Sequence, residues 1–222
     1  MLANVIKLWG KYSGVFLQGA LMTVQMSVIT VLLGLLLGSV LAFMKLSNWK
    51  IGKFNPLRTF SSIYVSVLRG TPILLQLYFF YFVLADLNLS TAQSVLVALV
   101  VNSAAYVAEI IRAGISAVDV GQVEAARSLG LSGRQTMLQI VLPQAVKNIL
   151  PAMGNELIMM IKETSLASTF FVGDLMTQAN IIAGASFLQV ECLIIAGIIY
   201  LVLTSVIGKL VNIFEKRLMV SD

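Results

Sequence analysis

The chain has 222 residues, of which 59% are hydrophobic and 11% are charged, with a net charge of +5. A soluble domain is about half apolar and about a quarter charged, so this composition is typical of a protein whose solvent is the lipid bilayer. The single cysteine and the lack of histidine exclude an internal disulfide and hydrolysis through a histidine base, and they argue against a zinc, copper or haem site.

The first long apolar stretch predicts a transmembrane helix at about residues 17–44, since a span needs about 20 mostly apolar residues. It is too long for the core of a cleaved signal peptide. The mixed residues 1–14 before it are expected to lie along the membrane interface. Gly34 and Gly38 form a small-xxx-small pair that would let another helix approach closely.

A basic loop at residues 45–58 is followed by an expected interfacial segment at about 57–68 and a second span from 72 to about 85. The break between them is the sequence Arg69-Gly70-Thr71-Pro72. Within it, Thr71 is placed to cap the second span, and the proline suits the first turn of a helix.

The remaining apolar stretches predict three more spans, at about 91–112, 146–162 and 189–213. Ser90 and Gln93 have the spacing of a capping box in front of the first of these. The polar sequence Lys162-Glu163-Thr164-Ser165 ends the second. We therefore expect an all-α membrane protein with five transmembrane helices, forming a single domain over residues 1–222.

Basic residues predict the orientation of these spans. They gather in the loop 45–58, in the region 112–147 and near the C-terminus, which share one side of a five-span arrangement. The other side keeps only Lys7 and Lys11. Because basic loops face the cytoplasm, we expect the N-terminus outside and the C-terminus inside, and we expect no nucleic-acid partner.

The loop at residues 118–143 is long and mixed in polarity. Asp119 is placed to cap a short helix that ends at Gly130 in a left-handed turn, and Ser132 to cap a second helix that Pro143 ends. Two short helices joined by a glycine make a compact knob. Its apolar residues have no lipid to face and are expected to dock into a partner protein: Val123, Ala125, Ala126 and Leu129.

This loop resembles the signature of permease subunits of binding-protein-dependent ABC importers. The matching elements are Glu124-Ala125-Ala126, then Gly130, then Ile140, Leu142 and Pro143 after a gap of nine residues. In that family the loop, often named the EAA loop, seats in a cleft on the ATPase subunit. The resemblance thus implies a coupling role for Asp119, Gly121, Glu124, Ala125, Ala126, Gly130, Ile140, Leu142 and Pro143. Glu124 alone could be a solvated charge that only favours the start of its helix, but the full motif outweighs that interpretation.

Other segments resemble the branch of this family that takes up histidine, arginine and glutamine. They are Leu68 to Pro72, then Tyr106, Glu109, Arg112 and Gly114, then Asn155-Glu156, and then Lys162, Thr164 and Ser165. The resemblance implies a methionine-importer-type fold in the bacterial inner membrane and a polar L-amino acid as substrate. It also implies a dimer of permease subunits, identical or different, with two ATPase subunits and an extracytoplasmic amino-acid-binding protein.

The energy source is expected in a separate chain. The Gly-Lys pairs are followed by Tyr, Phe or Leu, whereas a phosphate-binding loop has Ser or Thr at that position. We therefore expect no enzyme activity and no cofactor in this chain, with ATP and magnesium bound by the ATPase.

Polar residues inside spans are costly and usually face a cavity. They supply the candidates for a substrate path: Thr71, Gln76, Asn102, Glu156, Lys162, Glu163 and Ser165. Carboxylates would meet the ammonium of an amino acid, and the amides at the start of a helix would meet its carboxylate. Each has a structural alternative, because Glu156 can satisfy a neighbouring helix and Glu163 can pair with Lys162. The break at 162–165 can equally be a kink, and Glu109 and Arg112 have the spacing of a local ion pair.

Two other functions fit the apolar spans alone. An ion-gradient-driven secondary amino-acid transporter would need titratable groups at the membrane midplane and usually has two similar halves, which these spans lack. A membrane assembly protein would explain the spans but not the signature in residues 118–143.

Overall fold

The computed structural model describes residues 1–219, and side-chain surroundings through residue 216. The described chain is helical almost throughout and contains no strand. Its helices, in chain order, are α1 (Leu2–Leu46), α2 (Pro56–Gly70), α3 (Ile73–Val83), α4 (Thr91–Ser116), α5 (Val120–Ser128), α6 (Gly133–Thr136), α7 (Leu142–Glu163), α8 (Leu175–Ser186) and α9 (Gln189–Met219). A π-helix over Met137–Val141 and 3-10 helices over Ala85–Leu87 and Thr164–Phe170 connect some of them.

Helix α1 contains residues 2–14 as well as the predicted first span, so the two form one continuous helix. It has 45 residues and so extends about 68 Å, more than twice the hydrocarbon thickness of roughly 30 Å. Its first turns are held by packing, since Leu8 is buried in a cluster with Ala183 of α8 and Ile195 of α9. Packing against these helices thus continues the helix of the first span back to Leu2, and the interfacial position of residues 1–14 stays a prediction.

The predicted break after residue 70 is confirmed, because α2 and α3 meet at an angle of 111°. Its details differ from the expectation. Pro72 occupies the cap position of α3, and the Thr71 hydroxyl donates a 2.8 Å hydrogen bond to the Val67 carbonyl at the end of α2. Thr71 is extended, with φ −119° and ψ 147°, as a residue before proline prefers.

The core lies where α1 packs against α4. A Cβ added at Gly34 would lie 2.8 Å from Ser103 Oγ, and one added at Gly38 would lie 2.7 Å from Val107 Cβ. The small-xxx-small pair therefore lets α1 approach α4 closely, as predicted. The capping box at the start of α4 is also present, with Ser90 Oγ accepting from the Gln93 amide.

The prediction of five spans is not confirmed. Among the described helices, α1, α4 and α9 are long and apolar enough to cross a membrane, and the bent pair α2–α3 raises the number to four at most. Helix α7 occupies the region of the predicted fourth span. Its charged residues lower its hydropathy: Lys147, Glu156, Lys162 and Glu163.

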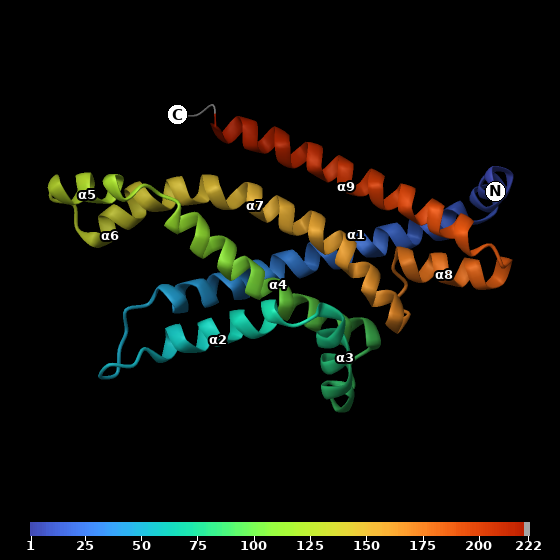
Figure 1. Ribbon diagram of the computed structural model, residues 1–222, viewed down its shortest axis with the longest axis horizontal. Helices are drawn as coiled ribbons and strands as arrows, with labels where there is room; N and C mark the ends of the chain where they lie inside the picture. The colour runs from blue at the N-terminus through green and yellow to red at the C-terminus, as the bar shows by residue number, and fades with distance from the viewer. Residues whose placement is uncertain (220–222) are drawn as a thin grey trace.

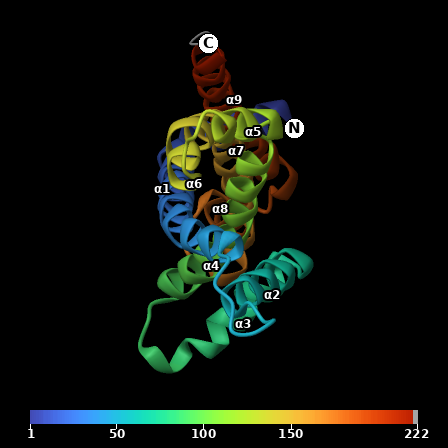
Figure 2. The same cartoon turned by 90° about the vertical axis from the view of Figure 1, so that its left-hand side faces the viewer.

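The helices place the loops at two ends of an elongated bundle. Figure 1 shows α5, α6 and the loop between α1 and α2 together at one end, with the N-terminus at the other. In the end-on view of Figure 2, α9 and α2 project from opposite sides of the molecule. The two loops that carry most of the predicted cytoplasmic charge therefore share one end.

Candidate functional site

The first helix of the loop 118–143 has the predicted ends. Asp119 Oδ1 accepts the Gly121 amide at 2.7 Å and caps α5. At the other end Gly130 has φ +87°, and the amides of Gly130 and Leu131 donate to the carbonyls of Arg127 and Ala126. These two bonds form a Schellman motif, whose left-handed position favours glycine.

The second helix starts as predicted but does not end at Pro143. Ser132 and Gln135 form a capping box at the start of α6. The chain then continues through the π-helix Met137–Val141 into α7. Pro143 lies in the first turn of α7, where the wider π turn accommodates a residue without an amide hydrogen. Residues 133–163 therefore form one continuous helical rod.

The knob presents only part of its apolar surface to solvent. Ala126 is buried, and Val123 packs in a cluster with Val118 and Val141, so these two residues hold the knob together instead of docking. Leu129 is 82% exposed. The signature residues that remain outside on α5 and at the start of α7 are Gly121, Glu124, Ala125, Gly130, Leu142 and Pro143, with Ile140 half-buried.

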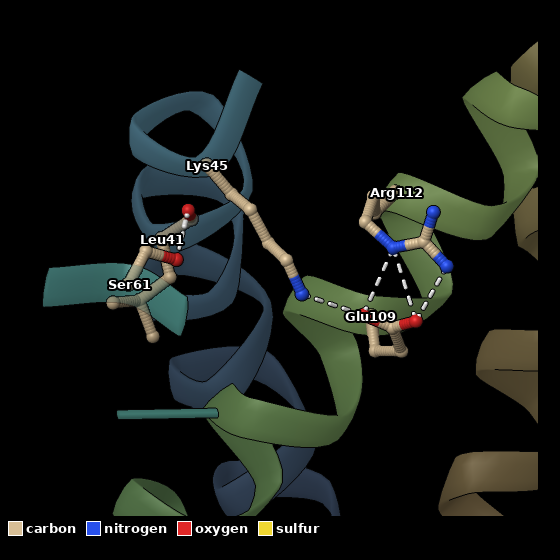
Figure 3. A network of polar contacts seen from close by, with 5 residues as sticks. All are labelled: Leu41, Lys45, Ser61, Glu109 and Arg112. Atoms are coloured by element: carbon tan, nitrogen blue, oxygen red, sulfur yellow. Dashed lines mark hydrogen bonds and ion pairs between the residues drawn. The ribbon is translucent and has the colours of Figure 1, made fainter. Parts of the chain in front are cut away.

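A cluster of charges joins α1 to α4 near the same end. Glu109 accepts from Arg112 at 2.6 Å, which confirms the local ion pair expected from their spacing. Lys45 of α1 reaches the same carboxylate at 3.0 Å, as Figure 3 shows. Beside it, the Ser61 hydroxyl of α2 donates to the Leu41 carbonyl at 2.7 Å. The contact from Lys45 was not foreseeable from spacing, because it joins two distant helices.

Three of the candidate path residues form a chain of hydrogen bonds beside the break between α2 and α3. Asn102 Nδ2 donates to Gln76 Oε1 at 2.8 Å, and Gln76 Nε2 donates to Thr71 Oγ1 at 2.8 Å. The Gln76 amide also donates to the carbonyls of Thr71 and Leu68. Asn102 is 2% exposed, and its Oδ1 has no partner among the described residues. A buried acceptor without a donor is costly, so this atom is a ready contact for a ligand.

Glu156 of α7 contacts α4 one residue further along, at Ser103. It is 8% exposed, and its Oε1 accepts the Ser103 hydroxyl at 2.8 Å. Ser103 was missed by the sequence analysis. The sequence feature that could have indicated it is its position next to Asn102. The structure places it on the face of α4 that packs against Gly34 of α1.

The last three candidates lie apart from this polar group. Lys162 is exposed and Glu163 is half-buried at the end of α7, and the Ser165 hydroxyl donates to the Lys162 carbonyl at 2.6 Å. Within residues 1–216, no hydrogen bond or salt bridge joins Lys162 to Glu163, or any of the three to Asn102 or Glu156. Between residues 1 and 219, no group of His, Cys, Asp and Glu side chains is placed to hold a metal ion.

The sequence profile of the family described as binding-protein-dependent transport system inner membrane component matches residues 32–220. The chain belongs to this family. This permease is 42% identical over 209 residues to the arginine transport system permease protein ArtQ of Bacillus subtilis (strain 168), with 93% of each chain covered.

Solved structures agree with this membership. A crystal structure of an amino acid ABC transporter with histidines contains a chain 44% identical to this permease, with a TM-score of 0.88 over 93% of this chain and 95% of that one. An inward-facing structure of the MetNI methionine ABC transporter, at 17% identity, has a TM-score of 0.79 over 94% of this chain and 98% of that one. The second likeness confirms the methionine-importer-type fold.

Membership confirms the function class predicted from the sequence, a transport permease and not an enzyme. Members of this family work with ATPase and binding-protein partners, and nucleotide binding belongs to the ATPase subunit. The ion-gradient-driven alternative is not supported by this assignment. This permease is an apolar, multi-helix inner membrane component.

Proposed function

We propose that this permease carries a polar L-amino acid into the bacterial cell, driven by ATP hydrolysis in a separate subunit. The observation that carries the proposal is the 44% identity and TM-score of 0.88 to a chain of an amino acid ABC transporter. The relative from Bacillus subtilis is named for arginine, and the solved transporter is described with histidines. Both amino acids have a polar side chain, which supports the same substrate class here.

The coupling loop, residues 118–143, docks on the ATPase in this proposal. Its support is a knob whose two helices are fixed by Asp119, Gly130 and Ser132, and whose outer surface carries Glu124 and the exposed Leu129. A large apolar side chain that is 82% exposed beyond the spans has no lipid to face and suits a protein partner.

In this proposal the substrate passes beside the buried polar side chains that contact α4, which are Thr71, Gln76, Asn102 and Glu156. A zwitterion needs partners of both signs. Glu156 and the unpartnered Asn102 Oδ1 accept hydrogen bonds and suit an ammonium, while the first amides of α3, beside Thr71 and Gln76, suit a carboxylate. Lys162 and Glu163 at the end of α7, and Ser165 in the 3-10 helix that follows, line the same route beyond Glu156.

The orientation proposed has the N-terminus outside and the C-terminus in the cytoplasm. It is supported by the basic residues and by the position of the loop 47–55 at the same end as α5 and α6 (Figure 1). The assembly proposed is a pair of permease subunits with two ATPase subunits, which hold ATP and magnesium, and an external amino-acid-binding protein.

The test is uptake by vesicles that contain this permease, its ATPase and its binding protein. We expect ATP-dependent uptake of arginine, histidine or glutamine, and little uptake of leucine. Uptake without ATP that follows an ion gradient would reject the proposal, as would transport of leucine alone. A vesicle with an ATPase that cannot hydrolyse ATP serves as the control.

A further inference from the structure

A polar cavity of about 310 Å³ lies where the end of α1, the start of α2 and the end of α4 meet. Its volume is at the lower end of the range of roughly 300–1,000 Å³ that is typical of small-molecule sites. The described residues that line it include three basic side chains and none that is acidic. The polar residues that matter here are Lys45, Arg58, Arg112, Ser47, Ser62 and Ser116.

The charges around this cavity do not cancel. Glu109 accepts hydrogen bonds from both Lys45 and Arg112, so one carboxylate serves two cations (Figure 3). Arg112 uses Nε and Nη2 for that contact, and its Nη1 has no partner among the described residues. The Arg58 guanidinium likewise has no ion pair or hydrogen bond within the described chain. An excess of positive charge therefore faces the cavity.

The position of Arg58 strengthens this argument. It is the third residue of α2, where the helix dipole disfavours a cation. The backbone amide of Arg58 donates to Asn55 Oδ1 at 2.9 Å, so Asn55 already caps α2. The positive charge of the Arg58 side chain therefore does not stabilise the helix. An anion in the cavity would contact the guanidinium and the positive end of α2 together, and would remove the electrostatic cost of both.

The surroundings of the cavity identify the source of the anion. The loop that continues from Ser47 carries exposed Trp49 and Phe54, with Lys50 and Lys53 between them. Exposed aromatic residues among basic ones are typical of the membrane–water interface. The α2 helix then presents exposed apolar side chains: Phe60, Ile63 and Val67. The cavity thus lies at the level of lipid headgroups, where the anions in greatest supply are those of phospholipids.

We infer that this cavity binds the anionic headgroup of a phospholipid from the leaflet at the coupling end. Arg58 and the free Nη1 of Arg112 contact the phosphate, and hydroxyl groups such as those of Ser62 and Ser116 donate to its remaining oxygens. This inference is independent of which amino acid is transported. It ties a lipid to the junction of α1, α2 and α4, directly beside the start of the coupling loop.

The test measures lipid binding to the full-length permease, purified in neutral detergent with its ATPase, by native mass spectrometry. The probes are dioctanoyl phosphatidylglycerol, dioctanoyl phosphatidylcholine and glycerol phosphate. We expect Arg58→Gln to weaken binding of the phosphatidylglycerol about tenfold, because it removes a charge-assisted hydrogen bond to the phosphate. Lys53→Gln is the matched control: it removes one charge from the loop before α2, outside the cavity lining, and should change the affinity less than twofold, because an exposed lysine without a direct contact contributes little.

A second variant, Ser62→Met, fills the cavity without changing charge and should also weaken phosphatidylglycerol binding. Equal losses for Arg58→Gln and Lys53→Gln would overturn the inference, because they would indicate diffuse attraction to the loop. Equal affinity for glycerol phosphate and for the lipid would overturn the assignment to a phospholipid. If Arg58→Gln weakens assembly with the ATPase and leaves lipid binding unchanged, the cavity belongs to a protein interface and the inference fails.

Discussion

The Ser103 hydroxyl donates a 2.8 Å hydrogen bond to the Glu156 carboxylate and thereby joins α4 to α7 inside the bundle. Gly34 of α1 covers the same serine, since an added Cβ would lie 2.8 Å from its Oγ and 3.0 Å from its Cβ. Three helices therefore meet around one buried carboxylate, and bulk added on α1 displaces the group that holds it.

Gly34→Ala should destabilise the permease by about 1–3 kcal/mol, as overpacking of a close contact does. It should also reduce uptake, because Ser103 must move away from Glu156. The measurement is the thermal unfolding midpoint in detergent. Gly14→Ala on the same helix is the control: nothing lies within 4 Å of its added Cβ, so its midpoint should stay the same or rise slightly. Equal midpoints for the Gly34 and Gly14 variants would contradict the close contact.

Glu156→Gln tests the substrate path. The glutamine amide keeps an oxygen that can accept from Ser103, so folding and assembly with the ATPase should survive. Uptake should fall or change its preference among amino acids, because the carboxylate that meets the ammonium is lost. Vesicle uptake with the binding protein and ATPase present is the measurement. Glu191→Gln, which changes a half-buried carboxylate that accepts from Asn4 at the start of α9, is the control and should transport normally.

Thr71→Val examines the other half of that path. The substitution removes the hydroxyl that accepts from Gln76 Nε2 at the break between α2 and α3, while the bonds from Gln76 Nε2 to the Leu68 and Thr71 carbonyls remain. We expect uptake to weaken while ATP hydrolysis stays coupled to the binding protein. If this variant and Glu156→Gln both transport the native substrate at the normal rate, the proposed path is wrong, even though the family assignment stands.

Gly130→Val tests the coupling loop. Gly130 has φ +87°, and nothing lies within 4 Å of an added Cβ, so the cost is backbone strain of about 1–3 kcal/mol. The variant should insert into the membrane but retain less ATPase on purification, and Glu124→Lys should do the same through its reversed charge. Gly133→Ala places its Cβ 3.7 Å from Arg127, an ordinary contact, and should keep the ATPase. Normal ATPase yield and uptake for Gly130→Val would count against the coupling role.

Thiol labelling tests the orientation. The buried Cys192 is first changed to alanine, and single cysteines then replace Ser128 on α5 and the exposed Leu87. We expect an impermeant reagent to label position 87 and not 128 in whole cells. Leu87 is preferable to Asn88, whose φ of +53° would strain a cysteine. External labelling at position 128 would reject both the orientation and the docking of the coupling loop on the ATPase.

Helix ends were predictable from the sequence because caps depend on residues within one turn. Ser90 with Gln93, Asp119 and Ser132 all cap as expected, and Gly130 takes the left-handed position. Pro143 misled for the same reason: its effect depended on the π turn before it, and no local signal marks that turn.

Contacts between distant helices were beyond the sequence. Val123 and Ala126 have the same local pattern as Leu129, and only the packing of α5 against α6 and the π-helix Met137–Val141 shows that they lie inside the knob. Ser103 with Glu156, and Lys45 with Glu109, are likewise 53 and 64 residues apart. The polar residues inside spans could be named in advance, but which of them bond to each other could not.

The unbroken helix from Gly133 to Glu163 has a mechanical consequence. A helix is stiff along its axis, and the distance from Val141 to Glu156 along it is about 22 Å. A force applied at the coupling loop therefore reaches the buried carboxylate along this one helix, in which the interior Pro151 removes a backbone hydrogen bond between Val141 and Glu156. Tilting this helix by a few degrees would move Glu156 relative to Ser103. The movement of the coupling loop would therefore break or re-form the hydrogen bond between these two residues.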